Sequence, residues 1–369
     1  MDAEKYLNIP QIPDSTNLWM IRTKDGYFFN EYIDECFIAI GWNIIRSSSF
    51  PLSKSQEDHL KDSIREIYGI IQSGSSINKC SKFCRDMKVG DIAVIVGKSH
   101  IAFAKIGELY EETNPEFTVE YEIEINKQIE DGVSVNEIHC PYIKRRKIEI
   151  INVIKNTENI NPYFSKVLSA NRHSLSSANR HADTILSTCY DVYIWNDTLS
   201  IAFRVDKNEN INAIALSRFI SYFSDFLIDI DEREISIKTA LNSPGDVILQ
   251  VCNWAVENWP IFVMAYMALF GTKIGPVEIH SVWSIIKYFL QRHDEAKLKE
   301  LEARGRELDN ALKEEEIRAL KLKNDEVEEK LRLTLPRLQH VSNELEIRKP
   351  KNNIINLSAA LNEIPHSEK

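Results

Sequence analysis

Three large side chains near the start of the chain have suitable chemistry for binding a flat molecule. The stretch "NLWMIRTKDGYFFNEYIDECFIAIGWN" holds Trp19, Arg22 and Trp42. An aromatic face stacks on a planar ring, and a guanidinium offers paired donors to the edge of that ring or to a phosphate. Core packing is the alternative interpretation: Trp42 would then close the end of a barrel, and Arg22 would pair with Asp25 or Asp91.

Signatures of catalysis are absent from the sequence. It contains no phosphate-binding loop of the G-x-x-x-x-G-K-[ST] type, no G-x-G-x-x-G, no H-E-x-x-H and no G-x-S-x-G. A metal-dependent nuclease needs an acidic residue and an E-x-K on adjoining strands, whereas Glu328–Lys330 lies in a highly charged helical stretch. The sequence therefore favours binding over catalysis, and we predict no catalytic residues and no cofactor.

The cysteines do not indicate a metal site. Cys80 and Cys84 could be combined with His100, His139 and Cys140, but this spacing matches no compact zinc pattern. Reduced, buried thiols are the simpler interpretation, and we predict no metal. The first residues are acidic and lack an apolar signal region, which favours a cytoplasmic protein.

The charge balance limits the kind of nucleic-acid contact that the chain can make. Its net charge is −10, and the first 150 residues carry 18 Lys and Arg against 24 Asp and Glu. Neutralising a phosphate backbone requires clustered basic residues, so we do not expect a basic surface that wraps nucleic acid. The run "YIKRRKIEI" is the densest basic stretch, and it is either a local patch or a solvated strand edge.

The residues up to about 155 alternate short apolar runs with turn signals. The runs "LWMIRT", "CFIAIGWN", "EFTVEYEIEI" and "YIKRRKIEIINVI" predict strands, and "SQEDHLKDSIREIYGIIQ" predicts an amphipathic helix. The stretch "KFCRDMKVGDIAVIVGKSHIAFAKIGELY" predicts a short helix and two strands joined at Gly97–His100. This pattern favours a small, curved, partly closed β-barrel.

The following residues, to about 245, predict a small α+β unit. Its parts are a helical region "NPYFSKVLSANRHSLSSANRHADTILSTC", a hairpin turning at Asn196–Asp197, a helix "INAIALSRFISYFSDFL" and a strand "EISIKTAL".

The remaining residues predict helices. The segment from 246 is apolar, but its clean run from Trp259 to Phe270 is short of the roughly 20 residues that span a bilayer. A buried or interfacial helix is favoured over a span. Beyond it, leucines at coiled-coil spacing predict a long charged helix that ends at Pro336, followed by a loose tail.

Four ordered motifs occur in the N-terminal segment. They are W-x-x-R at Trp19–Arg22, I-G-W at Ile40–Trp42, F-x-x-x-M-x-x-G-D at Phe83–Asp91, and P-x-x-x-R-x-x-x-E at Pro141–Glu149. With these motifs, residues 15–155 resemble the PUA/EVE-like domain found at the N-terminus of Mrr-type (type IV) restriction proteins and related prokaryotic defence proteins. The nuclease half of those proteins has no counterpart in this sequence.

The resemblance implies a β-barrel whose pocket receives a base, often a modified one, flipped out of a duplex. It implies a pocket lined by Trp19, Arg22, Trp42 and the connection at Lys98 and Ser99, with Tyr27 as a weaker candidate. If the pocket itself is basic, the acidic surroundings favour a small ligand, such as a free nucleotide or a signalling nucleotide, over a duplex.

The predicted fold class is α+β, with a PUA/EVE-like β-barrel, a central α+β unit, a hydrophobic helical segment, a coiled-coil helix and a flexible tail. These parts span residues 1–155, 156–245, 246–280, 281–335 and 336–369. The predicted function is a non-catalytic sensor of a modified nucleobase or nucleotide, in modified DNA or free, in anti-phage defence. We expect homo-oligomers formed through the C-terminal helix and a peripheral membrane contact through residues 246–270. The alternative is an interaction protein that acts through its C-terminal helices at a membrane or partner.

Overall fold

The computed structural model describes residues 9–134, 138–155, 162–170, 173–205, 211–228, 235–240, 245–251 and 333–349, with a few positions between 269 and 329. The chain divides into two compact units. The first unit is Ser15–Cys189, and the second unit combines Met1–Asp14 with Tyr190–Lys369. The predicted boundary near residue 155 thus falls inside the first unit, because a strand from residues 175–177 joins its sheet.

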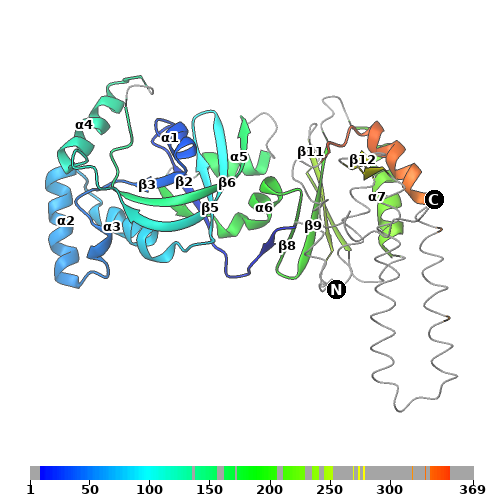
Figure 1. The fold of residues 1–369 in the computed structure, drawn as a ribbon, viewed down its shortest axis with the longest axis horizontal. Coiled ribbons are helices and arrows are strands. Elements are labelled where there is room, and N and C mark those ends of the chain that lie inside the picture. Colours follow the sequence, from blue (N-terminus) through cyan, green and yellow to red (C-terminus); the bar gives the residue numbers. More distant parts are fainter. Residues whose placement is uncertain are drawn as a thin grey trace, which may run out of the picture. The chain divides into compact units, whose positions relative to one another are not determined.

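A curled six-stranded sheet in the order β3-β6-β5-β4-β2-β7 frames the first unit. β2 is parallel to β4, and the other neighbouring pairs are antiparallel. Two register shifts between β5 and β6 accompany their bend, and the sheet curls into half a barrel (Figure 1). The α+β class and the curved, partly closed sheet are thereby confirmed. The strands are β2 (Leu18–Arg22), β3 (Phe37–Ile40), β4 (Ile92–Val96), β5 (His100–Glu111), β6 (Lys144–Lys155) and β7 (Leu175–Ser177).

Helices cover both faces of this sheet. The main core includes Tyr32, Phe37 and Phe83, which are buried between the sheet and its covering helices. On the opposite side of β5, Phe103 stacks on Phe164 at 6.1 Å between ring centroids. The helices are α1 (Phe29–Asp34), α2 (Lys54–Tyr68), α3 (Ser73–Ser81), α4 (Val119–Glu130), α5 (Pro162–Ala170) and α6 (Ala182–Cys189), with short turns η2 (Ser47–Ser49), η3 (Lys82–Asp86) and η6 (Asn179–His181).

One predicted strand of the first unit is wrong. The stretch "EFTVEYEIEI" alternates apolar and charged residues, yet its second half belongs to helix α4. Thr118 caps this helix by accepting a hydrogen bond from the Tyr121 amide. Glu122, Ile125 and Ile129 are buried, at the i, i+3, i+7 spacing of one helix face. Tertiary packing of this face overrides the local alternation.

The basic run is neither a patch nor a solvated edge. Lys144, Arg145 and Arg146 on β6 are all buried. Arg146 donates to the carbonyls of Phe83, Cys84, Met87 and Gly107. Arg145 donates to the carbonyls of residues 140 and 142, and its guanidinium lies 4.2 Å from the centroid of the ring of residue 37. These cations bind the protein's own backbone and are unavailable to a phosphate chain.

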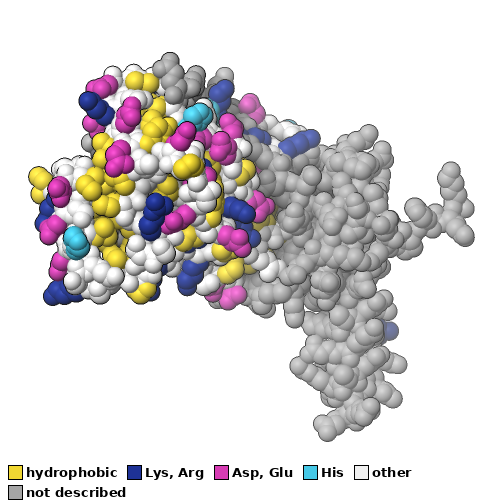
Figure 2. Space-filling view, turned by 60° about the vertical axis from the view of Figure 1, so that its left-hand side comes forward, with side chains coloured by type: hydrophobic (Ala, Val, Ile, Leu, Met, Phe, Trp, Pro, Cys, Tyr) yellow, Lys and Arg dark blue, Asp and Glu magenta, His cyan; other side chains and the backbone are white. Residues whose placement is uncertain are grey.

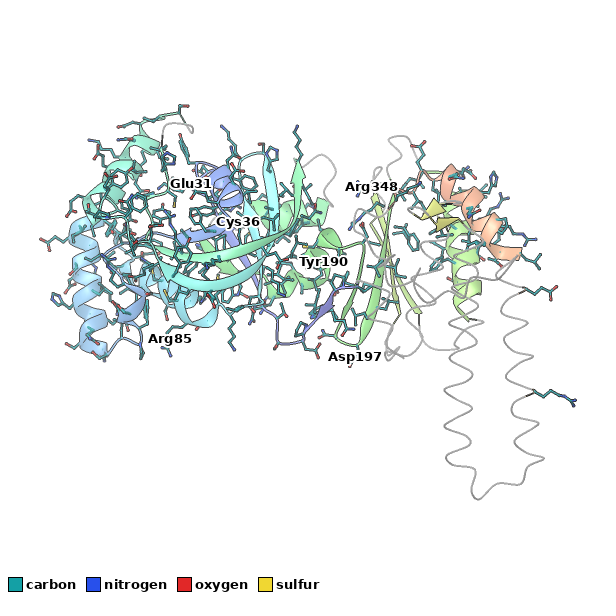
Figure 3. All side chains as sticks on the ribbon, in the orientation of Figure 1. Glu31, Cys36, Arg85, Tyr190, Asp197 and Arg348 are labelled. Atoms are coloured by element: carbon teal, nitrogen blue, oxygen red, sulfur yellow. The ribbon has the colours of Figure 1, made fainter. Side chains whose placement is uncertain are left out.

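The second unit is built on a five-stranded sheet in the order β1-β8-β9-β11-β10. The predicted hairpin is confirmed: β8 and β9 pair antiparallel around Asn196 and Asp197, which both have positive φ (Figure 3). Helix α7 and strand β10 also form as predicted. The elements are β1 (Gln11–Ile12), β8 (Val192–Trp195), β9 (Thr198–Val205), α7 (Ala213–Ile228), β10 (Ile235–Ala240), β11 (Gly245–Val251), β12 (Lys273–Ile274) and β13 (Val277–Glu278).

Two further predictions for the second unit need correction. Residues 246–251, placed at the start of a hydrophobic helical segment, form β11, because both neighbouring strands supply backbone partners. Residues 273–278 contain the short β12–β13 pair instead of a helix. The remainder of the hydrophobic segment and nearly all of the predicted coiled coil lie outside the described residues.

The part of the tail that is described is ordered against the second sheet. Residues 333–344 are helical and include Pro336, so the predicted helix end at this proline is wrong. Leu338, Val341 and Leu345 are buried, and the Arg348 amide donates to the Arg204 carbonyl. The spacing of the three apolar side chains gives the segment one buried face, which explains why it is not loose. Residues 350–369 lie outside the described part.

The predicted peripheral membrane contact falls mostly on residues 252–268, which lie outside the described residues. Among the described helices, none combines the length and the apolar character that crossing a bilayer requires.

Candidate functional site

A pocket of about 480 Å³ is lined by residues at the ends of β2 and β3 and by residues of α2, α3 and α4. Figure 2 shows hydrophobic side chains gathered among charged ones over the face that carries this end of the first unit. The volume falls in the range of about 300–1,000 Å³ that is typical of small-molecule sites. Its wall combines aromatic, basic and other polar side chains: Arg22, Trp42, Tyr68, Lys79, Glu122, Asn126, Tyr142 and Ser174.

Trp42 is held on the pocket wall by an unusual backbone conformation. Its φ is +61°, a left-handed value that large side chains rarely adopt. The preceding Gly41 leaves room for this turn, since a Cβ there would lie 2.7 Å from Glu122 Oε1 and 3.0 Å from Tyr142 Cε1. The loop is therefore shaped by its neighbours, and Gly41 is the residue type that fits.

Glu122 is the main anchor of this loop. Its Oε1 accepts from the Trp42 amide at 2.6 Å, and its Oε2 accepts from the Asn43 amide at 2.7 Å and from the Tyr68 hydroxyl at 2.7 Å. Burial, together with the negative charge of Glu122, raises the pKa of Tyr68, so this hydroxyl stays a donor. The carboxylate thus fixes two aromatic walls of the pocket at once.

Lys144 holds the same loop by donating hydrogen bonds to the carbonyls of the loop. Its side chain is fully buried, and its Nζ donates to the carbonyls of Trp42 and Ile45 at 2.8 Å each. A carboxylate on the amides and an ammonium on the carbonyls leave the loop little freedom. The backbone of Trp42 is consequently held on both sides, and its side chain lines the pocket.

Two polar atoms on the pocket wall lack partners among the described residues. They are Oδ1 of Asn126 and Oγ of Ser174, and both are buried. A buried polar group without a hydrogen bond costs about 1–3 kcal/mol. A ligand with a polar edge would satisfy these atoms, so the wall has the features of a ring-binding site with hydrogen-bonding capacity.

Of the six side chains predicted to line a pocket, the structure brings Arg22 and Trp42 together on one wall. Arg22 donates to the Leu168 carbonyl, and burial lowers its pKa, partly offset by Asp25. Trp19 is buried in the core instead, where its Nε1 donates to Asp91 Oδ2 at 2.8 Å. This contact joins the W-x-x-R motif to the G-D turn, so part of the motif set serves the fold.

The other three predicted side chains lie away from this wall. The Tyr27 hydroxyl donates to the Val133 carbonyl at 3.1 Å. Lys98 and Ser99 are exposed in the turn between β4 and β5. The Lys98 backbone packs so tightly on Gly26 that a Cβ on this glycine, which has φ +96°, would lie 2.8 Å from the Lys98 nitrogen.

Residues 19–161 match the family model of a domain of unknown function (DUF8426). No curated protein and no solved structure matches the chain. The match begins at Trp19 and includes Trp42 and Glu122, but it ends before Ser174 and Leu175, which complete the pocket wall. The first unit thus extends beyond the matched domain by β7 and its flanking helices.

Most residues of the pocket wall are not predicted by the sequence patterns. Glu122 and Asn126 are not predicted because the sequence of α4 has the alternating pattern of a strand. The signal that favours a helix here is Thr118, which precedes a first turn with acidic residues. Tyr142 and Lys79 lie far from Trp42 in sequence, and no local spacing connects them. Their contribution follows from the tertiary structure, since Lys79 lies on α3 and Tyr142 lies just ahead of β6.

The cysteines form no metal centre, as far as the described residues show. Burial raises the pKa of the Cys80 and Cys140 thiols to about 12 each, and that of Cys84 to about 11. Cys36, by contrast, is exposed between α1 and β3 (Figure 3).

These thiols should differ in reactivity. At pH 8 the raised pKa values keep Cys80 and Cys140 protonated, so iodoacetamide is expected to modify Cys36 in the native protein long before either of them. Peptide mass spectrometry at timed intervals measures this order, with the urea-unfolded chain as the control. Equal rates at Cys36 and Cys80 in the native protein would contradict it.

Proposed function

We propose that the first unit binds a nucleobase or nucleotide in the pocket beside Trp42 and does so as a non-catalytic sensor. The observation that carries this proposal is the backbone of Trp42, held at φ +61° by Glu122 and Lys144, while its indole lines the pocket. A strained loop that is bound from both sides while it presents an aromatic face is typical of a binding site. Base–aromatic stacking stabilises a complex by about 1–3 kcal/mol per base.

The rest of the wall supports a heteroaromatic ring over a purely apolar one. Tyr68 and Tyr142 add aromatic surface, and the unpaired atoms of Asn126 and Ser174 suit the polar edge of a base. Planar rings with hydrogen-bonding edges satisfy both features together, whereas a hydrocarbon would leave the polar atoms unpaired.

The resemblance to PUA/EVE-like domains points to the same ligand class and remains part of the proposal. It is supported by the curled half-barrel sheet and by the position of Trp42 at the end of β3. A role in anti-phage defence rests on that resemblance alone. The alternative, an interaction protein acting through C-terminal helices, rests on residues that are mostly outside the described part.

Calorimetric titration of the full chain tests the proposal. The probes are the four ribonucleosides, their 5′-monophosphates, 5-methylcytidine and N6-methyladenosine. We expect at least one to bind, and Trp42→Asn to weaken its binding by about 5–150-fold, the loss of one stacking contact. Asparagine tolerates the left-handed backbone, so this variant removes the ring without adding strain.

Two controls accompany this titration. Trp42→Phe keeps a ring and should retain part of the affinity, and Trp195→Asn in the second unit should leave it unchanged. Thermal unfolding confirms that each variant is folded. If no probe binds, or if Trp42→Asn binds as the native protein does, the proposed function is wrong.

A further inference from the structure

Lys79 is an unusual cation on the pocket wall. Its ammonium lies 5.6 Å from the centroid of the Trp42 ring. Among the described residues it has no carboxylate within ion-pair distance, and burial lowers its pKa. A partly desolvated ammonium held only against an aromatic face lacks the counter-charge that would compensate its lost hydration.

The pocket as a whole carries more positive than negative side chains. Arg22, Lys24, Lys79 and Lys127 line it, against Glu122 and Glu130. The Glu122 carboxylate already accepts three hydrogen bonds from the protein, so it offers little to a ligand. The site is therefore locally cationic, although the chain has a net charge of −10.

Three exposed isoleucines make part of the pocket rim unsuitable for the phosphates of a nucleic-acid strand. Ile67 and Ile123 line the pocket while 40% and 36% exposed, and Ile71 on the neighbouring loop is 88% exposed. A strand that left the pocket across these isoleucines would place its phosphates over apolar side chains. Lys144 and Arg146 cannot supply the missing contacts, because they are buried on backbone carbonyls.

We infer that the ligand is a free mononucleotide whose base stacks on Trp42 and whose phosphate pairs with Lys79. The inference rests on the proposed function, and it adds the anionic group and the absence of a continuing strand. The flexible four-carbon stem of Lys79 lets its ammonium leave the indole face and reach a phosphate beside the bound ring. A phosphate thus supplies the counter-charge that Lys79 lacks.

The test compares each ribonucleoside with its 5′-monophosphate on the full chain by calorimetry. We expect the affinity of the preferred monophosphate to be at least about tenfold higher than that of its nucleoside. One charge-assisted hydrogen bond provides a difference of this size. Lys79→Met should abolish this difference by weakening the monophosphate, with nucleoside affinity changed by less than about threefold. Lys79→Arg should keep most of the difference.

The matched control is Lys61→Met. Lys61 lies on α2 near Gly74 of α3, does not line the pocket, and pairs with Glu57 and Asp58 at 2.7 and 3.2 Å. Its substitution removes the same charge from the neighbouring helix and should leave both affinities unchanged. An equal loss in both variants would show a general charge effect and overturn the role of Lys79.

The remaining outcomes separate the inference from the function on which it rests. If nucleosides and monophosphates bind equally, the phosphate contact is wrong while the base pocket stands. If a single-stranded tetranucleotide or a 12-base-pair duplex binds more tightly than the monophosphates, a strand is the ligand and the inference is overturned. If neither nucleosides nor nucleotides bind, both proposals fail.

Discussion

Replacing Arg146 with methionine is expected to lower the free energy of unfolding of the first unit by about 3–5 kcal/mol. Arg146 is 4% exposed, and its guanidinium donates to four backbone carbonyls from η3, from the turn after it and from β5. Methionine fills a similar volume but leaves these carbonyls buried without donors. Each unsatisfied group costs about 1–3 kcal/mol, and relaxation of the loop recovers part of the sum.

The measurement is hydrogen exchange of β5 and β6 peptides as a function of urea, which reports on this unit separately from the second one. Lys147→Met is the matched control, because Lys147 is the next residue on β6 and is exposed. It removes the same charge and should shift stability by less than about 0.5 kcal/mol. A loss below about 1 kcal/mol for Arg146→Met would mean that the carbonyls find other donors.

Replacing Glu122 with glutamine is expected to destabilise the first unit by about 2–3 kcal/mol and to weaken ligand binding as strongly as Trp42→Asn does. The glutamine oxygen can replace one carboxylate oxygen. Its NH₂ group would then face donors, since both oxygens of Glu122 accept hydrogen bonds in the native protein. The amides of Trp42 and Asn43 would compete for one acceptor, and the left-handed loop would lose its main support.

Glu124→Gln on the same helix is the control. Glu124 is exposed, and its described hydrogen bond comes from Gln128 at 3.3 Å. This substitution makes the same change of charge without touching the loop, so stability and binding should stay at native values. Glu122→Gln with native stability and reduced binding would place Glu122 in direct contact with the ligand. Native values of both would refute its role as the anchor.

The first strands show how far local sequence determines this fold. The apolar runs at residues 18–22, 37–40 and 92–96 form β2, β3 and β4, and Asn196–Asp197 forms the hairpin turn. In these segments the spacing of apolar residues and the turn residues favour the same structure as the tertiary contacts do. Each segment therefore adopts the structure that it favours locally. The position of Trp42 just after β3, following Gly41, is likewise predicted by the local sequence.

Local sequence fails where long-range contacts compete with it. The alternation in α4 predicts a strand, but burial of Glu122, Ile125 and Ile129 on one face stabilises a helix. "KRRK" has the charge of a surface patch, but Lys144 and Arg146 are buried because backbone carbonyls from distant segments satisfy their charges. Such partners cannot be read from spacing along one strand.

The sequence by itself thus determined the α+β class, the early strands and the aromatic and basic residue types available for a flat ligand. Only the tertiary structure decided their roles: it placed Trp19 in the core on Asp91 and Trp42 on a pocket wall. The physical reason is that a pocket is defined by residues from separate elements. Trp42, Glu122 and Lys144 meet only because the curled sheet and α4 bring them together, and the hydrogen bonds between them hold the backbone of Trp42 in place.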